Sequence, residues 1–209
     1  MLSISLPNFK SQFDKNIVRE IRKEIAARMP KVIDAVQERL GVELFDAIQD
    51  SPTWRAVKAG SLRGELGIAN VASLDNILLT WADGVEVTYE QNKEFGILRI
   101  GMIQADYSDV LSLPESSFVS SSARTGNTSV IEWLRWLLLE STAIIVSNYS
   151  FVPKNNGRTG LGIMIETGRG WRIPQQYAGS ATDNFATRSL QNIGSVIDKV
   201  VEEEVNRRF

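Results

Sequence analysis

Apolar residues recur every three or four positions between Lys15 and Leu40, with charged residues between them. This spacing puts the apolar side chains on one face of an amphipathic helix. Asp14 is placed to cap the start of that helix, and Gly41 is placed to end it. Pro30 lies inside the segment and lacks the N–H that a helix interior uses. We therefore expect it to kink the helix or to split it in two.

Shorter helices follow the first one. The segment 44–66 predicts helical pieces joined by turns, with a break at Gly60. Ser73 is placed to cap a further helix over 74–82, because its hydroxyl can accept from the first free N–H groups of a helix. Asp83 and the glycine after it predict the turn that ends this helix.

The period of the pattern then changes from helical spacing to alternation. Residues 85–104 alternate apolar and polar side chains around a turn at 91–93, which predicts a β-hairpin. We expect a helical turn over 106–113. Two further strands are predicted over 143–151 and 161–166, the second of them flanked by glycines.

Two helices are expected in the C-terminal half. One is the Trp- and Leu-rich segment 130–140, and the last runs from a cap at Thr182 or Asp183 to about Arg208. Together these elements predict an α+β fold, with an antiparallel sheet of about four strands flanked by a long N-terminal and a long C-terminal helix. No internal repeat or domain boundary is visible, so residues 1–209 are predicted to form a single domain.

The segment 114–129 is rich in serine and is predicted to be a long loop or arm. A loop of this length is uncommon inside a compact domain unless it has a function or is disordered. It is either a passive linker or an arm that orders only on assembly, with contacts between subunits offsetting the entropy of ordering. The sequence leaves both interpretations open.

The chain of 209 residues has no cysteine and no histidine. Without cysteine it can form no disulfide, zinc ribbon or thiol nucleophile. Without histidine it lacks Ser-His-Asp triads, His-ligated metals and the usual proton carrier at neutral pH. Its carboxylates are scattered and form neither an EF-hand loop nor an obvious catalytic pair. The sequence therefore predicts no enzyme, no cofactor and no metal site.

Charge and hydropathy exclude further classes of function. The formal net charge is −2 and the isoelectric point is about 5.4, so there is no overall basic field of the kind that binds nucleic acid. The most apolar window, 131–146, carries Glu132, Arg135 and Glu140, which make it too interrupted to span a hydrocarbon core of about 30 Å. No secretory signal is visible. We expect a soluble protein made in a cytoplasm, with no membrane partner.

Glycines punctuate the segment 157–190 and invite comparison with phosphate-binding loops. The Gly157, Gly160 and Gly162 run lacks the lysine and hydroxyl residue of a Walker loop. These glycines also flank a strand, whereas a dinucleotide fingerprint lies between a strand and a helix. The more economical interpretation is that they are turn residues with positive φ.

Arginines recur beside these turns. They either grip anionic groups of a partner protein or are simply solvated. Arginine and aromatic residues are enriched together at protein interfaces, and Trp171 and Tyr177 lie nearby, which favours contact. For the tryptophans at 133 and 136, core packing is the default interpretation and an intersubunit seam is the alternative. The arginines in question are Arg124, Arg158, Arg169 and Arg172.

Three blocks of the chain resemble small neck and tail-completion proteins of tailed bacteriophages. The first is Ser51–Trp54 together with Gly60–Gly67, whose Gly-Ser-Leu-Arg-Gly-Glu-Leu-Gly is similar to a turn in virion proteins of contractile-tailed phages. The second is Trp133–Leu139. The third contains Arg158–Met164 and continues through Trp171-x-x-Pro174 to Asn184-Phe185-x-Thr187-Arg188. In order it is similar to the C-terminal end of lambda Z-like tail-completion proteins.

The resemblance implies a structural virion protein of a tailed bacteriophage, and a contractile-tailed one is favoured. Such a neck or tail-completion subunit forms a ring, commonly a hexamer, at the head–tail junction or the tail end. Its implied partners are copies of itself, neighbouring neck and tail proteins, and DNA passing non-specifically through the lumen. Alternatives are a tail terminator, a sheath initiator or a baseplate component and, more remotely, an enzyme that acts on an anionic substrate.

The residues expected to make protein contacts come from these blocks and from the neighbouring loops. One expected docking surface is the Leu62–Gly67 turn, and the other is centred on Trp171. Replacing Trp171 by alanine is expected to leave the monomer folded and to weaken assembly by about 2 kcal/mol or more. The full set is Leu62, Arg63, Glu65, Arg124, Arg158, Trp171, Arg172, Pro174, Tyr177, Asn184, Phe185 and Arg188.

Overall fold

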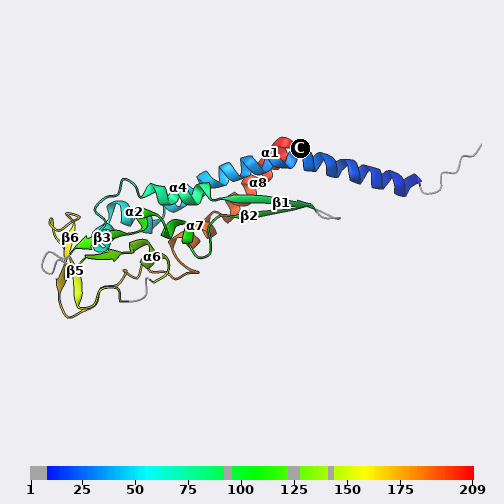
Figure 1. The fold of residues 1–209 in the computed structure, drawn as a ribbon. Helices are drawn as coiled ribbons and strands as arrows, with labels where there is room; N and C mark the ends of the chain where they lie inside the picture. Colours follow the sequence, from blue (N-terminus) through cyan, green and yellow to red (C-terminus); the bar gives the residue numbers. More distant parts are fainter. Residues whose placement is uncertain (1–8, 92–95, 122–127, 141–143) are drawn as a thin grey trace, which may run out of the picture.

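The computed structural model describes residues 9–91, 96–121, 128–140 and 144–209. A helical body carries three β-hairpins, and the N-terminal part of the first helix extends beyond that body (Figure 1). In chain order the elements are α1 (Phe9–Gln49), α2 (Pro52–Ala59), α3 (Ser61–Leu66), α4 (Asp75–Asp83), β1 (Glu86–Gln91), β2 (Gly96–Gly101), α5 (Ser108–Leu111), the 3₁₀ turn η1 (Pro114–Ser116), β3 (Phe118–Ser121), β4 (Thr128–Ile131), α6 (Trp133–Leu138), β5 (Tyr149–Pro153), β6 (Gly162–Glu166), α7 (Phe185–Asn192) and α8 (Gly194–Arg208).

Helix α1 is one element of 41 residues, Phe9–Gln49, and is about 60 Å long. The predicted cap at Asp14 is therefore wrong, because this residue lies inside the helix. The helix is also not split at Pro30. An interior proline costs about 3 kcal/mol, and burial of apolar side chains such as Met29 and Val32 beside it offsets that cost.

Gly41 does not end α1, contrary to the prediction. It is buried where α4 approaches α1, and a Cβ built on it would lie 2.7 Å from the carbonyl oxygen of Ala82. The glycine thus permits a close approach between two helices. Beyond it, Leu44 and Ile48 continue the apolar seam at a spacing of four and are fully buried. Tertiary packing carries the helix past a residue that locally favours a stop.

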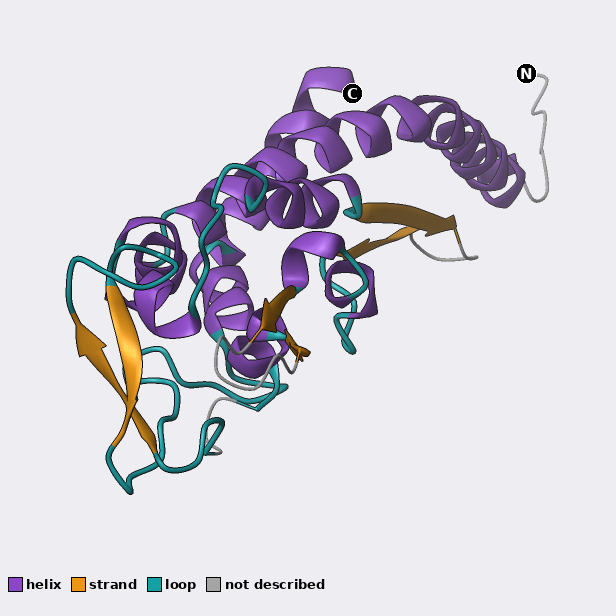
Figure 2. Ribbon diagram, turned by 60° about the vertical axis from the view of Figure 1, so that its left-hand side comes forward, coloured by secondary structure: helices purple, strands orange, loops and turns teal. Residues whose placement is uncertain are grey.

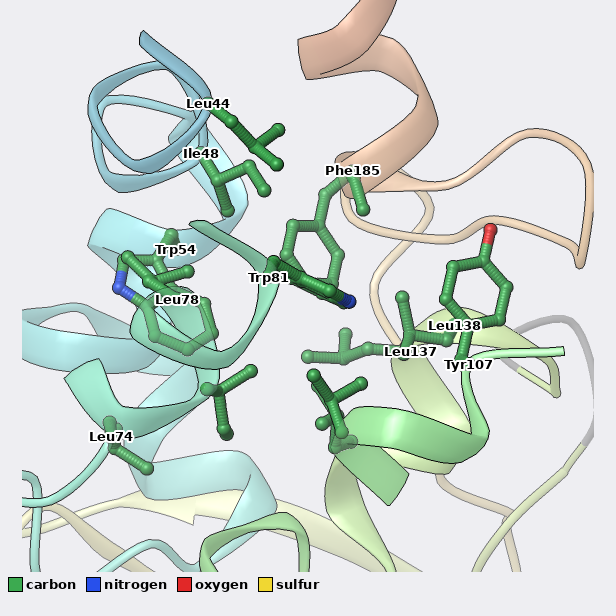
Figure 3. Close-up of a cluster of buried hydrophobic side chains, with 14 of the residues drawn as sticks. Leu44, Ile48, Trp54, Leu74, Leu78, Trp81, Tyr107, Leu137, Leu138 and Phe185 are labelled. Carbon is green, nitrogen blue, oxygen red and sulfur yellow. The ribbon is translucent and has the colours of Figure 1, made fainter. Parts of the chain in front are cut away.

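The centre of the core is a cluster of aromatic rings. Phe185 at the start of α7 lies 6.1 Å from the ring of Trp54 on α2 and 6.1 Å from the ring of Trp81 on α4. Figure 3 shows this ring cluster between Leu44 and Ile48 of α1 on one side and side chains of α6 on the other. These contacts join helices from both halves of the chain around one interior.

The predicted helices between residues 44 and 82 are confirmed as α2, α3 and α4. Gly60 does separate α2 from α3. The cap of α4, however, is Leu74, which makes no side-chain hydrogen bond there, and not Ser73. Gly67 ends α3 with a φ of 74°, a left-handed conformation that favours glycine.

The predicted sheet of about four strands is wrong, because the strands form three separate two-stranded antiparallel sheets. The hairpin over 85–104 is confirmed as β1–β2, with Glu86 paired to Gly101 and Gln91 to Gly96. Its predicted turn at 91–93 lies mostly outside the described residues. Alternation along a segment indicates a strand but not the neighbour with which it pairs. Here β1 packs against α1, and β6 packs against α3.

The Ser-rich segment is not a featureless loop. It contains η1 and β3, and it continues into β4, with Phe118 paired to Ile131 and Ser121 paired to Thr128. The apolar residues lie at one end of this hairpin, in the pairs Phe118–Ile131 and Val119–Val130, and the polar residues lie at the other end. The residues 122–127 between the two strands lie outside the described part of the chain.

The predicted strand 143–151 is replaced by a shorter and later one, β5. Val146 makes a single antiparallel bridge with Trp171, and Asn148 follows with a positive φ of 66°. This turn residue separates the bridge from β5, which pairs with β6 from Tyr149–Glu166 to Pro153–Gly162. The predicted strand 161–166 is confirmed as β6.

The last helix is divided and starts later than predicted. Asn184, not Thr182 or Asp183, caps α7: its side chain accepts from Ala186 and Thr187, and the Thr187 hydroxyl accepts from the Asn184 N–H. Ile193 then separates α7 from α8. The reciprocal pair of hydrogen bonds is a capping box.

Helix α8 lies against α1 (Figure 1). The Arg39 guanidinium donates to Glu204 and to Glu203, each over 2.8 Å. These hydrogen bonds hold the pKa of both carboxyls below their usual value. At the end of α8, Arg28 of α1 donates to the carbonyl of Arg208 over 2.7 Å. The body therefore begins near Arg28, and the preceding part of α1 extends outward.

Candidate functional site

An open groove of about 640 Å³ lies between α3, α6 and the hairpins β3–β4 and β5–β6. We call it the hairpin groove. Its walls are largely apolar, and the strands β3, β4, β5 and β6 all contribute residues to it. Figure 2 shows β5–β6 at the end of the molecule opposite the extended part of α1. Apolar lining residues include Phe118, Ile131, Trp136, Phe151, Ile163 and Met164.

The hairpin groove brings together the three blocks of sequence described above. Gly64–Gly67 comes from the first block, Trp136 from the second, and Arg158, Met164 and Trp171 from the third. These blocks are separated by tens of residues along the chain, so only the fold brings them to one place.

Trp171 forms a fixed wall of the groove. Its indole Nε1 donates to Oε2 of Glu65 over 3.0 Å, and its ring lies edge-on to Trp136 at 6.5 Å. Its backbone N–H donates to the carbonyl of Val146 over 2.8 Å. The residue is 7% exposed. Side chain and backbone are thus both held within the chain.

Glu65 is a half-buried carboxylate in an apolar wall. Burial raises its pKa, and hydrogen bonds from Trp171 and Ser61 only partly oppose that shift. The indole cannot take a proton from it. Among the described lining residues the other charged group is Arg158. The groove therefore offers shape, apolar surface and one acceptor, which suit binding of a protein segment.

Arg158 closes one edge of the hairpin groove. Its guanidinium lies over the ring of Phe118, 3.9 Å from the centroid, and donates to the carbonyl of Gly67. Burial lowers its pKa. The contact over an aromatic face adds a cation–π attraction. Arg158 thereby ties the β5–β6 hairpin to the end of α3 and to β3, which fixes the width of the groove.

Four of the predicted contact residues are buried inside the chain. Leu62 and Asn184 have no exposed surface, Phe185 is 3% exposed, and Trp171 is described above. The Asn184 amide donates to the Tyr107 hydroxyl over 2.7 Å and to the carbonyls of Leu138 and Ser180. These side chains support the fold from within.

The remaining predicted residues have mixed positions. Arg63 donates to the carbonyls of Ile68 and Ala69, so it holds the loop after α3. Arg188 pairs with Asp183 over 2.7 Å, away from the hairpin groove. Arg172 is exposed, and Pro174 and Tyr177 are partly buried in the segment that leads to α7. Arg124 lies outside the described residues.

Sequence reasoning missed most of the apolar wall and a second groove between α1 and α4. The wall residues Phe118, Phe151 and Met164 each have an apolar neighbour in their own strand, so no regular alternation in the sequence marks them as wall residues. The second groove is lined by Asp34, Glu38, Asp83 and apolar neighbours. Asp34 and Glu38 are one helical turn apart on α1, but Asp83 comes from α4, so no local pattern joins it to them.

The described residues contain neither a candidate metal site nor a candidate membrane-spanning helix. No group of three or more Asp or Glu side chains among them could hold a metal ion. No helix in the described ranges is both long and apolar enough to cross a bilayer.

Comparison with known proteins identifies no relative of this chain. No protein-family model matches the chain, and no curated protein or solved structure is significantly similar to it.

Proposed function

We propose that this chain is a structural virion protein of a tailed, contractile-tailed bacteriophage. In this proposal it is a neck or tail-completion subunit that forms a ring, of six copies, at the head–tail junction or the tail end. One observation carries the proposal: each of the three blocks that resemble such proteins contributes residues to the hairpin groove. A resemblance spread by chance along the chain would have no reason to converge in space.

The groove supports a docking role in the following way. A neighbouring virion protein inserts apolar side chains between Phe151, Ile163 and Trp136, which removes apolar surface from water. The half-buried Glu65 carboxylate accepts a hydrogen bond from the inserted segment and fixes its position. Arg158 and Trp171 are already held by intrachain contacts, so little side-chain entropy is lost on docking.

The proposal is tested by locating the chain in virions and by naming its neighbours. Immunogold labelling of purified virions is expected to place the chain at the neck or the tail end. A tagged copy is expected to co-purify with portal and connector proteins. Recovery with tube or sheath proteins instead would favour a tail terminator, a sheath initiator or a baseplate component. Absence of label from all virion parts would overturn the structural assignment.

A pair of matched variants tests the groove itself. Val119 lines the hairpin groove and is 67% exposed, so Val119→Asp places a charge at the docking surface without disturbing the core. Ile144 is 63% exposed and does not line the groove, so Ile144→Asp is the control. We expect only the first variant to lose the co-purifying partner. Equal recovery with both variants would remove the groove from the docking surface.

A further inference from the structure

The extended part of α1, residues 15–28, carries an apolar stripe that is largely exposed from Ile17 to Ile21, although Gln91 at the end of β1 lies beside Val18 and Ile25 packs against the core. We call this part the arm. Ile17, Val18 and Ile21 are 41%, 46% and 53% exposed. They continue the seam that is buried from Met29 onward, so the same helix face is covered in the body and bare in the arm. Figures 1 and 2 both show the arm reaching beyond the body.

Basic residues border this bare stripe. Between positions 15 and 23 there are four basic residues and one acidic residue, Glu20. The arm therefore combines an apolar stripe with positive charge, in a chain whose net charge is −2. The basic residues are Lys15, Arg19, Arg22 and Lys23.

The groove between α1 and α4 carries the opposite charge, and we call it the acidic groove. Its volume is about 560 Å³. Val42, Phe45 and Leu79 form its apolar surface, with Val42 57% and Leu79 47% exposed. Its charged lining is acidic throughout the described residues, and comprises Asp34, Glu38 and Asp83.

We infer that the arm of one copy lies in the acidic groove of a second copy. The apolar stripe would cover Val42, Phe45 and Leu79, and the arginines and lysines would face the acidic rim. Both surfaces are apolar at their centres, and their bordering charges are opposite in sign. This inference rests on the proposed ring and names the contact that joins its subunits.

A chain cannot fill its own acidic groove with its own arm. Both surfaces lie on α1, and Val18 and Glu38 are 20 residues apart, a distance of about 30 Å along the helix. At about 100° per residue, Glu38 also points to nearly the opposite side of the helix from Val18. The occupant must therefore be another molecule, and the chain itself carries a complementary one.

The contact is heterologous, because two different surfaces meet. Each copy that offers its arm to a neighbour keeps its own acidic groove free for a third copy. Such a head-to-tail contact closes into a ring when the rotation between copies permits it. This is the symmetry that a ring-forming virion subunit needs.

Thiol cross-linking tests the contact directly, because the chain has no cysteine of its own. Val18→Cys on one preparation and Leu79→Cys on another are mixed and treated with a short bis-maleimide reagent. We expect a cross-linked dimer from the mixture, and a ladder of higher species when both changes are in one chain. Val18→Cys mixed with Ile165→Cys, an exposed position on β6, is the matched control and is expected to give none.

Two cross-linking outcomes would overturn the inference. A dimer formed by Val18→Cys alone would mean that two arms pair with each other. No product from the mixture would mean that the arm lies elsewhere, whether the protein is monomeric or forms rings through another surface. Immunogold labelling and co-purification report on the virion role independently, so failure of the contact and failure of the proposed function remain distinct.

Reversal of charge gives a second test that needs no cross-linker. The variant Arg19→Glu/Arg22→Glu has an acidic arm and an acidic groove, and Asp34→Arg/Glu38→Arg has a basic arm and a basic groove. Light scattering is expected to show at least a tenfold loss of self-association for either variant alone, and recovery in an equal mixture. Arg55→Glu/Lys199→Glu, at exposed positions remote from the arm, is the control. Failure of the mixture to recover would contradict the inference.

Discussion

The indole Nε1 of Trp171 donates a hydrogen bond to Oε2 of Glu65 over 3.0 Å, although the two residues are 106 positions apart in the sequence. The pair joins the loop before α7 to α3 and forms one wall of the hairpin groove. Because Trp171 is 7% exposed, it contributes little of the groove surface, and its neighbours contribute most of it.

Replacing Glu65 by glutamine changes how stability depends on pH. Burial raises the pKa of Glu65, so the folded state binds this proton more tightly than the unfolded state does. As pH rises from near 4.5 through the raised pKa, this residue makes folding less favourable. Glu65→Gln keeps an acceptor for Trp171 and removes the charge. We expect the variant to be more stable than the parent at pH 7 and equally stable at pH 4.

Urea unfolding midpoints at pH 4, 5, 6, 7 and 8 measure this effect. Asp50→Asn is a suitable control, because the Asp50 side chain is 72% exposed. A parent-to-variant difference that is constant with pH would show that Glu65 does not titrate differently in the folded state.

Replacing Trp171 by alanine is expected to unfold the wall and not merely to weaken assembly. The change removes a buried ring, its edge contact with Trp136 and the donor to Glu65. We expect a loss of about 3–5 kcal/mol in the free energy of unfolding, by urea titration followed with circular dichroism. Arg172→Ala, at the exposed neighbouring position, should change it little. If the Trp171 variant were as stable as the parent, Trp171 would not be a structural residue, and the predicted role in protein contacts would stand.

Replacing Asn184 by alanine removes a cap and an interior hydrogen-bond donor together. The carboxamide oxygen accepts from Ala186 and Thr187 at the start of α7, and the amide donates to Tyr107. We expect a loss of about 2–4 kcal/mol, because a helix end and a buried hydroxyl both lose a partner. Thermal unfolding of Thr182→Ala, two positions earlier and exposed, provides the comparison. Equal melting temperatures of the two variants would argue against a stabilising role of the Asn184 side chain.

Replacing Gly41 by alanine separates α1 from α4. Alanine favours a helix by about 1 kcal/mol over glycine, but its Cβ would lie 2.7 Å from a backbone oxygen of Ala82. A backbone atom must move, so we expect a net loss of about 1–3 kcal/mol and a wider acidic groove. Gly194→Ala, at a helical position with open space around it, is expected to be neutral or stabilising. Denaturant midpoints compare the two, and a stabilised Gly41 variant would refute the close approach.

Local patterns in the sequence predicted most of the elements. The spacing of apolar residues identified α1, and the alternation after position 85 identified β1–β2. Capping chemistry was less informative, because Asn184 is preceded by Thr182 and Asp183, which are also good caps. Only the contact with Tyr107 in the folded protein selects one of them.

What the sequence could not predict depends on contacts between distant segments. Gly41 reads locally as a helix end, and only the position of Ala82 shows that it is a contact point. Three hairpins and one four-stranded sheet have the same alternating pattern, so pairing had to come from the structure. For the candidate site, Glu65 and Trp171 were each selected from the sequence, but their contact and the apolar wall around them were not predicted.

The unbroken length of α1 constrains which changes the chain can tolerate. Each residue added between the arm and the acidic groove lengthens the helix by about 1.5 Å and rotates the arm by about 100°. A single insertion would therefore turn the arm away from a neighbour while scarcely displacing it. Seven inserted residues would nearly restore its direction but shift it by about 10 Å. The length of helix around Pro30 therefore sets both the reach and the direction of the arm, and an insertion or deletion there is expected to disrupt the inferred contact.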